Sequence, residues 1–236
     1  MLEVLSDEDT EKLELPKLIK EQKVDGMIVI GRHGGKYIEV LRSIDKIPLL
    51  YLDFFDEVGN CDAVITNSFY GTYMLTNYLF QMGHTKIGYV GTLLSTGSIT
   101  DRYFGYAKSL LEHGQEVRKD WVIEDRDVEE GLVGKGFEII LPKEMPTAFV
   151  CNCDLTASEV IKRLREKSLR VPEDVSVVGF DNFLFPGLCD VPITTYEVDT
   201  KEMVRKSLQI LIKKIRKEYT KAGVNVVEGQ LIFRNS

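Results

Sequence analysis

The stretch RVPEDVSVVGFDN, residues 170 to 182, decides the fold class. A turn around Pro172 leads into an apolar run from Val175 to Phe180, and this run stops at Asp181. A continuous apolar run of this length is typical of a strand that is covered on both faces, as in a parallel sheet. Ligands of open parallel sheets bind beyond the carboxyl ends of the strands. Asp181 is therefore a candidate ligand-binding residue.

Similar apolar runs alternate with amphipathic segments along the chain. We expect strands at residues 26–31, 47–52, 62–67, 86–91, 147–152 and 174–180. We expect helices at residues 69–83, 101–114, 154–168 and 200–221. The first two of these helices end in glycine, which is a common C-terminal stop. This alternation predicts an α/β fold with doubly wound parallel sheets.

Length and composition limit the class of protein. A chain of 236 residues fits one large domain or two lobes, and its net charge of −7 argues against a nucleic-acid-binding surface on this chain. The acidic start lacks the plan of a signal peptide, and no apolar run is long enough for a membrane span, so we expect a cytoplasmic protein that does not engage a membrane. Few, irregularly spaced cysteines favour reduced thiols over a disulfide framework. They are Cys61, Cys151, Cys153 and Cys189.

A second strand also ends in an acid, because LLYLD stops at Asp53. Each of the two carboxylates, Asp53 and Asp181, could accept hydrogen bonds from ligand hydroxyl groups. Each could equally cap the turn or helix that follows it. Two such acids from distant parts of the chain make a cleft for a polar ligand the more attractive interpretation.

Motifs for catalysis, metals and cofactors are missing from the sequence. GRHGG, residues 31 to 35, lacks the spacing of a dinucleotide fingerprint, and there is neither a P-loop nor a G-x-S-x-G elbow. The three histidines show no metal-ligand spacing. The CNC triplet could hold a soft metal, although two thiols alone are a weak signal. We therefore expect no enzyme, no metal and no cofactor, and an α/β enzyme remains a third hypothesis.

Several motifs occur together in the order of one known family. The segments are residues 66–91, 101–114, 146–157, 170–182 and 193–196. In this register they resemble the regulatory core of the LacI/GalR family of bacterial transcription regulators. The resemblance runs from about Val24 to the end, where LIFRNS is similar to the closing strand and Arg-x-Ser of the family.

The resemblance implies a fold of two α/β lobes of the type I periplasmic-binding-protein kind, joined by three crossovers, with a small ligand between them. It places residues 1–68 plus 194–222 in the N-terminal lobe. Residues 69–193 plus 223–236 form the C-terminal lobe. Residues 2–26 resemble the second strand and second helix of the family core, so the first core strand and the basic DNA-binding head are expected to be absent from this chain.

Three residues match ligand-binding positions of the family: Asp53, Arg102 and Asp181. A guanidinium offers a rigid fork of donors for two neighbouring hydroxyls or a carboxylate, and carboxylates accept charge-assisted hydrogen bonds from hydroxyls. Without the resemblance, Arg102 in DRYFGY would be read as a surface ion-pair residue near a helix start.

Other candidates are secondary. Cys153 falls where relatives carry Asn or Gly that faces the ligand, and it could equally be a small buried thiol. Asp154 is expected to cap the following helix. Asp127 lies near a position where an aromatic ring packs on the ligand, and Arg126 could offer polar contacts instead. Arg32 is expected to be solvated.

These observations predict the effector-binding core of a LacI/GalR-type regulator. By the resemblance, it forms a homodimer, binds a small-molecule effector such as a sugar, and controls operator DNA through a helix-turn-helix head that this chain does not contain. The alternative is a transport-type sugar-binding protein, against which the missing export signal argues.

Overall fold

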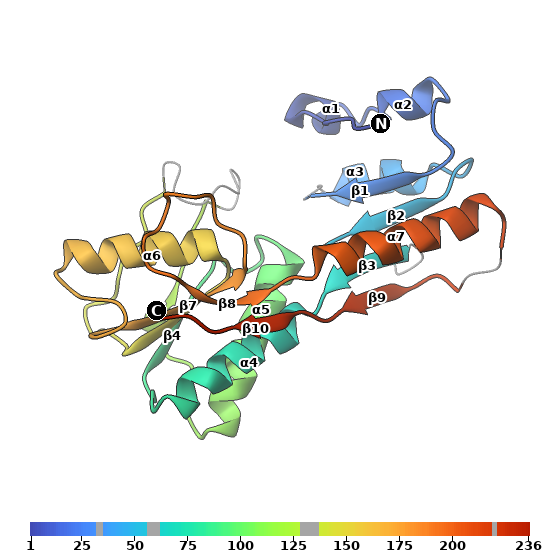
Figure 1. The fold of residues 1–236 in the computed structure, drawn as a ribbon. Helices are drawn as coiled ribbons and strands as arrows, with labels where there is room; N and C mark the ends of the chain where they lie inside the picture. The colour runs from blue at the N-terminus through green and yellow to red at the C-terminus, as the bar shows by residue number, and fades with distance from the viewer. Residues whose placement is uncertain (32–34, 56–61, 128–136, 219–220) are drawn as a thin grey trace. The chain divides into compact units, whose positions relative to one another are not determined.

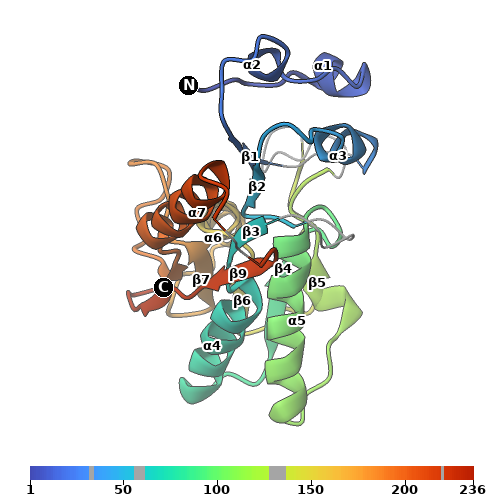
Figure 2. The ribbon, with the colours of Figure 1, turned by 90° about the vertical axis from the view of Figure 1, so that its right-hand side faces the viewer.

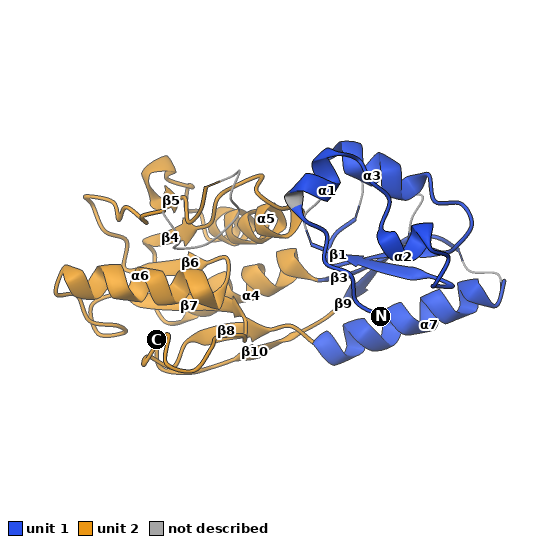
Figure 3. Ribbon diagram, turned by 90° about the horizontal axis from the view of Figure 1, so that it is seen from above, with its two compact units in different colours: residues 1–66, 200–227 blue, residues 67–199, 228–236 orange. Residues whose placement is uncertain are grey.

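The computed structural model describes residues 1–31, 35–55, 62–127, 137–218 and 221–236. The chain divides into two compact units (Figure 3). Unit 1 comprises Met1–Thr66 and Thr200–Val227, and unit 2 comprises Asn67–Asp199 and Glu228–Ser236. Arg32, His33 and Cys61 lie outside the described residues.

Unit 1 contains a parallel sheet in the order β1-β2-β3-β9. Its strands are β1 (Met27–Ile30), β2 (Leu49–Leu52), β3 (Asp62–Thr66) and β9 (Val224–Val227). Its helices are α1 (Asp7–Glu11), α2 (Lys17–Lys20), α3 (Gly35–Arg42) and α7 (Thr200–Ile215) (Figure 1). Helix α7 is joined to the sheet by an ion pair between Lys214 and the buried carboxylate of Asp62 on β3.

Unit 2 contains a larger sheet in the order β10-β8-β7-β6-β4-β5. All neighbouring strands are parallel except β10, which is antiparallel to β8. The strands are β4 (Ile87–Val90), β5 (Val122–Ile123), β6 (Ala148–Cys151), β7 (Ser176–Asp181), β8 (Thr194–Glu197) and β10 (Gln230–Ile232). The helices are α4 (Ser68–Gln81), α5 (Gly97–Glu112), α6 (Asp154–Glu166) and the short 3₁₀ helix η1 (Lys119–Trp121) (Figure 2).

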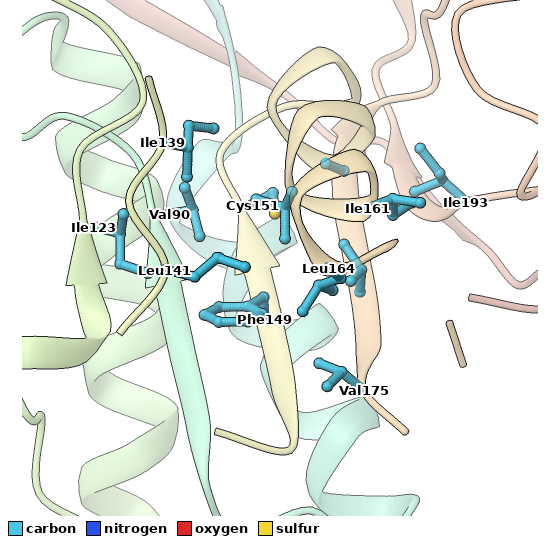
Figure 4. Packing of buried hydrophobic residues seen from close by; sticks show 13 residues of the cluster. Val90, Ile123, Ile139, Leu141, Phe149, Cys151, Ile161, Leu164, Val175 and Ile193 are labelled. Carbon is cyan, nitrogen blue, oxygen red and sulfur yellow. The ribbon is translucent and has the colours of Figure 1, made fainter. Parts of the chain in front are cut away.

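The sheet of unit 2 is covered on both faces. Helices α4 and α5 pack on one face, where Ala148 and Val150 of β6 contribute to the core. Helix α6 packs on the other face, where Phe149 and Cys151 of the same strand contribute (Figure 4). All four side chains are buried. Because side chains alternate between the faces of a strand, burial on both sides requires an uninterrupted apolar run.

The expected α/β fold with parallel sheets in two units is confirmed. Each of the six expected strands is present with ends within two residues of those expected. All four expected helices are present as α4, α5, α6 and α7. Strands β5, β8 and β9 were not expected, because none of them lies in a long apolar run, whereas β10 lies at the closing strand that the resemblance implied.

The expectation for residues 2–26 was wrong in its detail. Residues 2–5 form no strand, and two short helices replace the single helix. Helix α1 begins at a capping box between Ser6 and Asp9. Pro16 lies directly before α2, and a proline inside a helix removes a hydrogen bond and clashes with the preceding turn. One continuous helix through this position is therefore disfavoured.

The two compact units differ from the expected lobes in the placement of two strands. Strand β8 belongs to unit 2, although residues from 194 onward were assigned to the N-terminal lobe. Strand β9 pairs with β3 inside unit 1, although residues from 223 onward were assigned to the C-terminal lobe. The expected domain boundaries themselves stay a prediction.

Gly179 on β7 has no room for a side chain. A Cβ atom there would lie 2.1 Å from Oδ1 of Asp154 and 3.1 Å from a methyl carbon of Ile193. Both neighbours are buried. The first turn of α6 therefore packs directly on the backbone of β7.

We expect Gly179→Ala to lower the free energy of unfolding by about 1–3 kcal/mol or more, because the added methyl overpacks a buried contact. Thermal unfolding followed by circular dichroism measures the change. Gly97→Ala is the matched control, since no heavy atom lies within 4 Å of a Cβ there. Equal unfolding midpoints for the two variants would contradict the close approach.

Candidate ligand-binding site

Arg102 lies at the carboxyl edge of the unit 2 sheet. Helix α5 begins after Thr96, whose hydroxyl accepts the amide of Ile99, and Arg102 follows in the next turn. The residue is only 5% exposed. Since a buried cation is stable only where hydrogen bonds replace its water, the surroundings of this guanidinium define the centre of the site.

Every nitrogen of the Arg102 guanidinium donates a hydrogen bond. Nη1 donates to the carbonyl of Asn152 at 2.5 Å, and Nη2 donates to Oδ1 of Asp181 at 3.1 Å. Nε donates to the hydroxyl of Ser68 at 3.4 Å. The plane also lies over the ring of Phe180, 3.8 Å from its centroid. A cation over an aromatic face gains further electrostatic stabilisation.

Asp181 is the exposed partner of this pair. Its side chain is 35% exposed, against 6% for Arg102. It ends β7 with φ of +94° and is followed by Asn182 with φ of +52°. The carboxylate oxygens of Asp181 can therefore accept hydrogen bonds from a polar ligand. The neighbouring guanidinium of Arg102 balances the negative charge of this carboxylate.

A second arginine and acid form a closed network beside the first. Both oxygens of the fully buried Asp125 carboxylate accept from Arg126, and Oδ2 also accepts from Asn152 Nδ2 at 2.7 Å and Thr156 Oγ1 at 2.6 Å. Burial alone would raise the pKa of Asp125, but the hydrogen bonds and charge of Arg126, with those of Thr156 and Asn152, lower it to about 2.

Asn152 joins the two networks. Its carbonyl accepts from Arg102, and its side-chain oxygen accepts from Arg126 at 3.1 Å. The sequence analysis missed both Asn152 and Asp125. Asp125 follows strand β5 closely, but this short strand lies in no long apolar run, so the signal that marked Asp53 and Asp181 does not extend to it.

Cys153 caps helix α6. Its Sγ accepts the amide of Thr156 at 3.4 Å and lies 3.2 Å from the hydroxyl of that residue. Burial raises the pKa of the thiol, which keeps it neutral. The expectation that Asp154 caps this helix was wrong, because Asp154 is the first helical residue and its Oδ2 accepts the amide of Phe183 at 3.0 Å.

Asp154 carries a buried carboxyl group, and burial disfavours its charged form. The residue is 4% exposed. Burial, with the nearby charge of Asp181, raises the pKa of its carboxyl to about 7, although the amide of Phe183 and the charge of Arg234 oppose the shift. The folded state therefore favours the protonated carboxyl.

Two predicted residues remain, Asp53 and Asp127. Asp53 belongs to unit 1, where it follows β2, is exposed, and has φ of +65°. Asp127 is exposed and directly precedes residues outside the described part. Of the six predicted site residues, the structure brings Arg102, Asp181, Arg126 and Cys153 to one edge of unit 2.

Two other kinds of feature are absent from the described ranges. No group of three or more His, Cys, Asp or Glu side chains there is placed to hold a metal ion. Within the same ranges, no helix combines the length and apolar character that crossing a membrane requires. Cys151, Cys153 and Cys189 are free thiols.

Comparison with known proteins agrees with this fold. Residues 76–236 match the family model described as a periplasmic binding protein-like domain. The HTH-type transcriptional repressor PurR of Pasteurella multocida is 30% identical over 227 residues, which cover 95% of this chain and 67% of the relative. PurR of Actinobacillus pleuropneumoniae is 32% identical, with 94% of this chain and 66% of the relative covered.

Solved structures show the same fold. A complex of the transcriptional regulator CelR with cellobiose superposes with a TM-score of 0.81 at 23% identity and covers 98% of this chain and 71% of that one. The regulator CcpA of Lactococcus lactis gives a TM-score of 0.79 at 22% identity, with coverage of 97% and 83%. The chain belongs to the LacI/GalR family of transcription regulators and carries its periplasmic-binding-protein-like core. It spans about two thirds of the length of the curated relatives it matches.

We expect Asp154→Asn to stabilise the fold at pH 8 but not at pH 4. The folded pKa of about 7 lies above the ordinary 3.8, so the wild-type free energy of unfolding falls as pH rises from about 4 to about 7. The full loss is on the order of 4 kcal/mol, and asparagine does not incur it.

Urea unfolding of both proteins between pH 4 and pH 8 measures this difference. The exposed Asp190→Asn is the matched control, because an ion pair with Arg165 lowers the pKa of Asp190. A difference between wild type and Asp154→Asn that does not change with pH would rule out the raised pKa.

Proposed function

We propose that this chain is the effector-sensing core of a transcriptional repressor and that it binds a small, uncharged, hydroxyl-bearing metabolite at Arg102 and Asp181. The observation that carries the proposal is the pairing of a guanidinium that is 6% exposed with a carboxylate that is 35% exposed. Every guanidinium nitrogen is already engaged, so the group is fixed before a ligand arrives. Preorganised polar groups lose little entropy on binding.

The chemistry of the pair favours polyols over apolar ligands. Asp181 can accept from ligand hydroxyls, and each Nη nitrogen of Arg102 carries a second N–H that can donate to a ligand oxygen. A site of this kind rejects analogues without the hydroxyl, because its buried polar groups would lose their partners. The CelR complex contains cellobiose, which makes that sugar the first compound to test.

The names of the relatives favour a regulator over the transport-type binding protein. They are called transcriptional repressors, with the prefix that denotes a helix-turn-helix head. In this proposal the ligand shifts the core between two arrangements only if it binds them with different affinity. Ligand and operator affinity are then linked reciprocally, with a coupling of about 1–3 kcal/mol. Homodimerisation and a cytoplasmic location are part of the same proposal, and no catalytic step is included.

We expect Asp181→Asn and Arg102→Lys each to weaken ligand binding by about tenfold to a hundredfold, because each removes a charge-assisted hydrogen bond or the fork geometry. A thermal-shift screen of sugars, sugar phosphates and nucleosides, with cellobiose included, identifies the ligand. Titration calorimetry then measures the affinity. Arg170→Lys is the matched control, since Arg170 forms an exposed bidentate pair with Asp174. Unchanged affinity in both site variants would remove the assignment.

Asp53 is a separate part of the proposal. It rests on the position of the residue after β2 and on the family resemblance, because Asp53 lies in the other unit. We expect Asp53→Asn to weaken binding of the same ligand about tenfold, with an unchanged unfolding midpoint, through loss of one charged acceptor. Calorimetry with Asp45→Asn as the unit 1 control tests this, and full affinity in Asp53→Asn would restrict the site to unit 2.

A further inference from the structure

The turn that follows β7 is held in a costly conformation. Asp181 has φ of +94° and Asn182 has φ of +52°, and neither is glycine. Left-handed backbone costs roughly 1–2 kcal/mol per residue for most side chains with a Cβ, and less for Asp and Asn, whose short polar side chains can form local hydrogen bonds. Such a conformation persists only where its surroundings fix it. The contacts of this turn therefore decide where the Asp181 carboxylate lies.

Asn182 uses its side chain and its amide as anchors. Its amide donates to Thr195 Oγ1 at 3.3 Å, and its Nδ2 donates to Glu197 Oε1 at 2.7 Å. Both partners are on β8, the strand beside β7. Its Oδ1 accepts from Arg234 Nη2 at 2.7 Å. The contacts with Glu197 and Arg234 are both charge-assisted, and of the three contacts the one with Arg234 comes from outside the β7–β8 pair.

Arg234 is itself fixed on the segment that follows β10. Its Nη1 donates to the carbonyl of Ile193 at 2.6 Å. Its amide donates to Thr194 Oγ1 at 2.9 Å, and the same hydroxyl donates to its carbonyl at 2.9 Å. Two residues on, Ser236 Oγ accepts the amide of Thr194 and donates to the carbonyl of Val177. These hydrogen bonds hold the segment after β10 against both β8 and β7. The side chain of Arg234 reaches back from this segment to Asn182 in the turn after β7.

We propose that Arg234 is a positioning residue for the ligand-binding site: through Asn182 it fixes the Asp181–Asn182 turn and so holds the Asp181 carboxylate against Arg102. The expected effect of Arg234 on ligand affinity rests on the proposed function. The structural link from Arg234 to the Arg102–Asp181 pair does not, and it can be tested without a ligand.

The fork of the guanidinium is necessary for this role. Nη1 and Nη2 serve different acceptors, the carbonyl of Ile193 and the side chain of Asn182, in one plane. A lysine has one nitrogen at the end of a flexible stem and cannot reproduce the fixed pair of donors. Arg234→Lys is therefore expected to keep the charge and lose most of the positioning.

The test compares wild type with Arg234→Met and Arg234→Lys by nitrogen-15 NMR and amide hydrogen exchange. In wild type, the Nη protons of Arg102 are held by Asn152 and Asp181, so we expect them to give signals in slow exchange that are absent from Arg102→Lys. We expect both Arg234 variants to lose or shift these signals and to speed exchange of the Phe183 amide at least about tenfold, because its turn is released. Arg170→Met is the matched control and is expected to change neither.

The pathway through Asn182 gives a sharper criterion. Asn182→Ala should produce the same loss of the Arg102 signals, and adding Arg234→Met to it should change nothing further. Additive effects of the two substitutions would overturn the proposed link, as would intact Arg102 signals and unchanged Phe183 exchange in both Arg234 variants. If Arg234→Met fails to fold, Arg234→Lys supplies the same readouts.

The two proposals fail in different ways. If Asp181→Asn weakens binding of the ligand found by the screen while Arg234→Lys leaves both affinity and NMR signals unchanged, the positioning role is wrong and the site stands. If the Arg234 variants release the turn while Asp181→Asn and Arg102→Lys bind that ligand normally, the ligand site is wrong and the link from Arg234 to the Arg102–Asp181 pair stands.

Discussion

The carboxyl edge of the unit 2 sheet is organised around the buried charge of Arg102. A buried guanidinium is costly unless hydrogen bonds replace the water it has lost. Here the replacements are the Asn152 carbonyl, the Asp181 carboxylate, the Ser68 hydroxyl and the face of Phe180. These groups come from the ends of two strands and the start of a helix. The contacts that satisfy the charge therefore also fix these ends relative to one another.

Two arginine–carboxylate pairs share this edge but have different surroundings. Asp125 and Arg126 are 0% and 13% exposed in their side chains, and Asn152 and Thr156 complete their hydrogen bonds. Such a closed pair has little capacity for a ligand and holds β5 near the ends of β4 and β6. Asp181 is one third exposed and can accept further hydrogen bonds. The difference in solvent access thus separates a structural pair from the proposed ligand-binding pair, although both contain the same two residue types.

The site residues that the sequence predicted fall into two groups. Asp181 could be predicted from a local signal, an acid that ends an apolar run, whereas Arg102 needed the motif order, because an arginine near a helix start alone indicates a surface ion pair. The roles of Arg126 and Cys153 could not be predicted. Arg126 turns inward because Asp125 is buried beside it, and Cys153 caps α6 through Thr156. Nothing in the local pattern indicates which neighbour a polar side chain will find, because that neighbour is supplied by another segment.

The sequence by itself determined the α/β class, the long helices and the buried strands, since a strand covered on both faces must be apolar at every position and a covering helix must be apolar at every third or fourth. Only the tertiary structure decided that β9 pairs with β3, that Asp154 binds the amide of Phe183, and that Arg234 reaches Asn182. The physical reason is that short strands and single polar contacts gain their stability from partners remote in the chain. The local pattern of apolar residues does not indicate which partners these are.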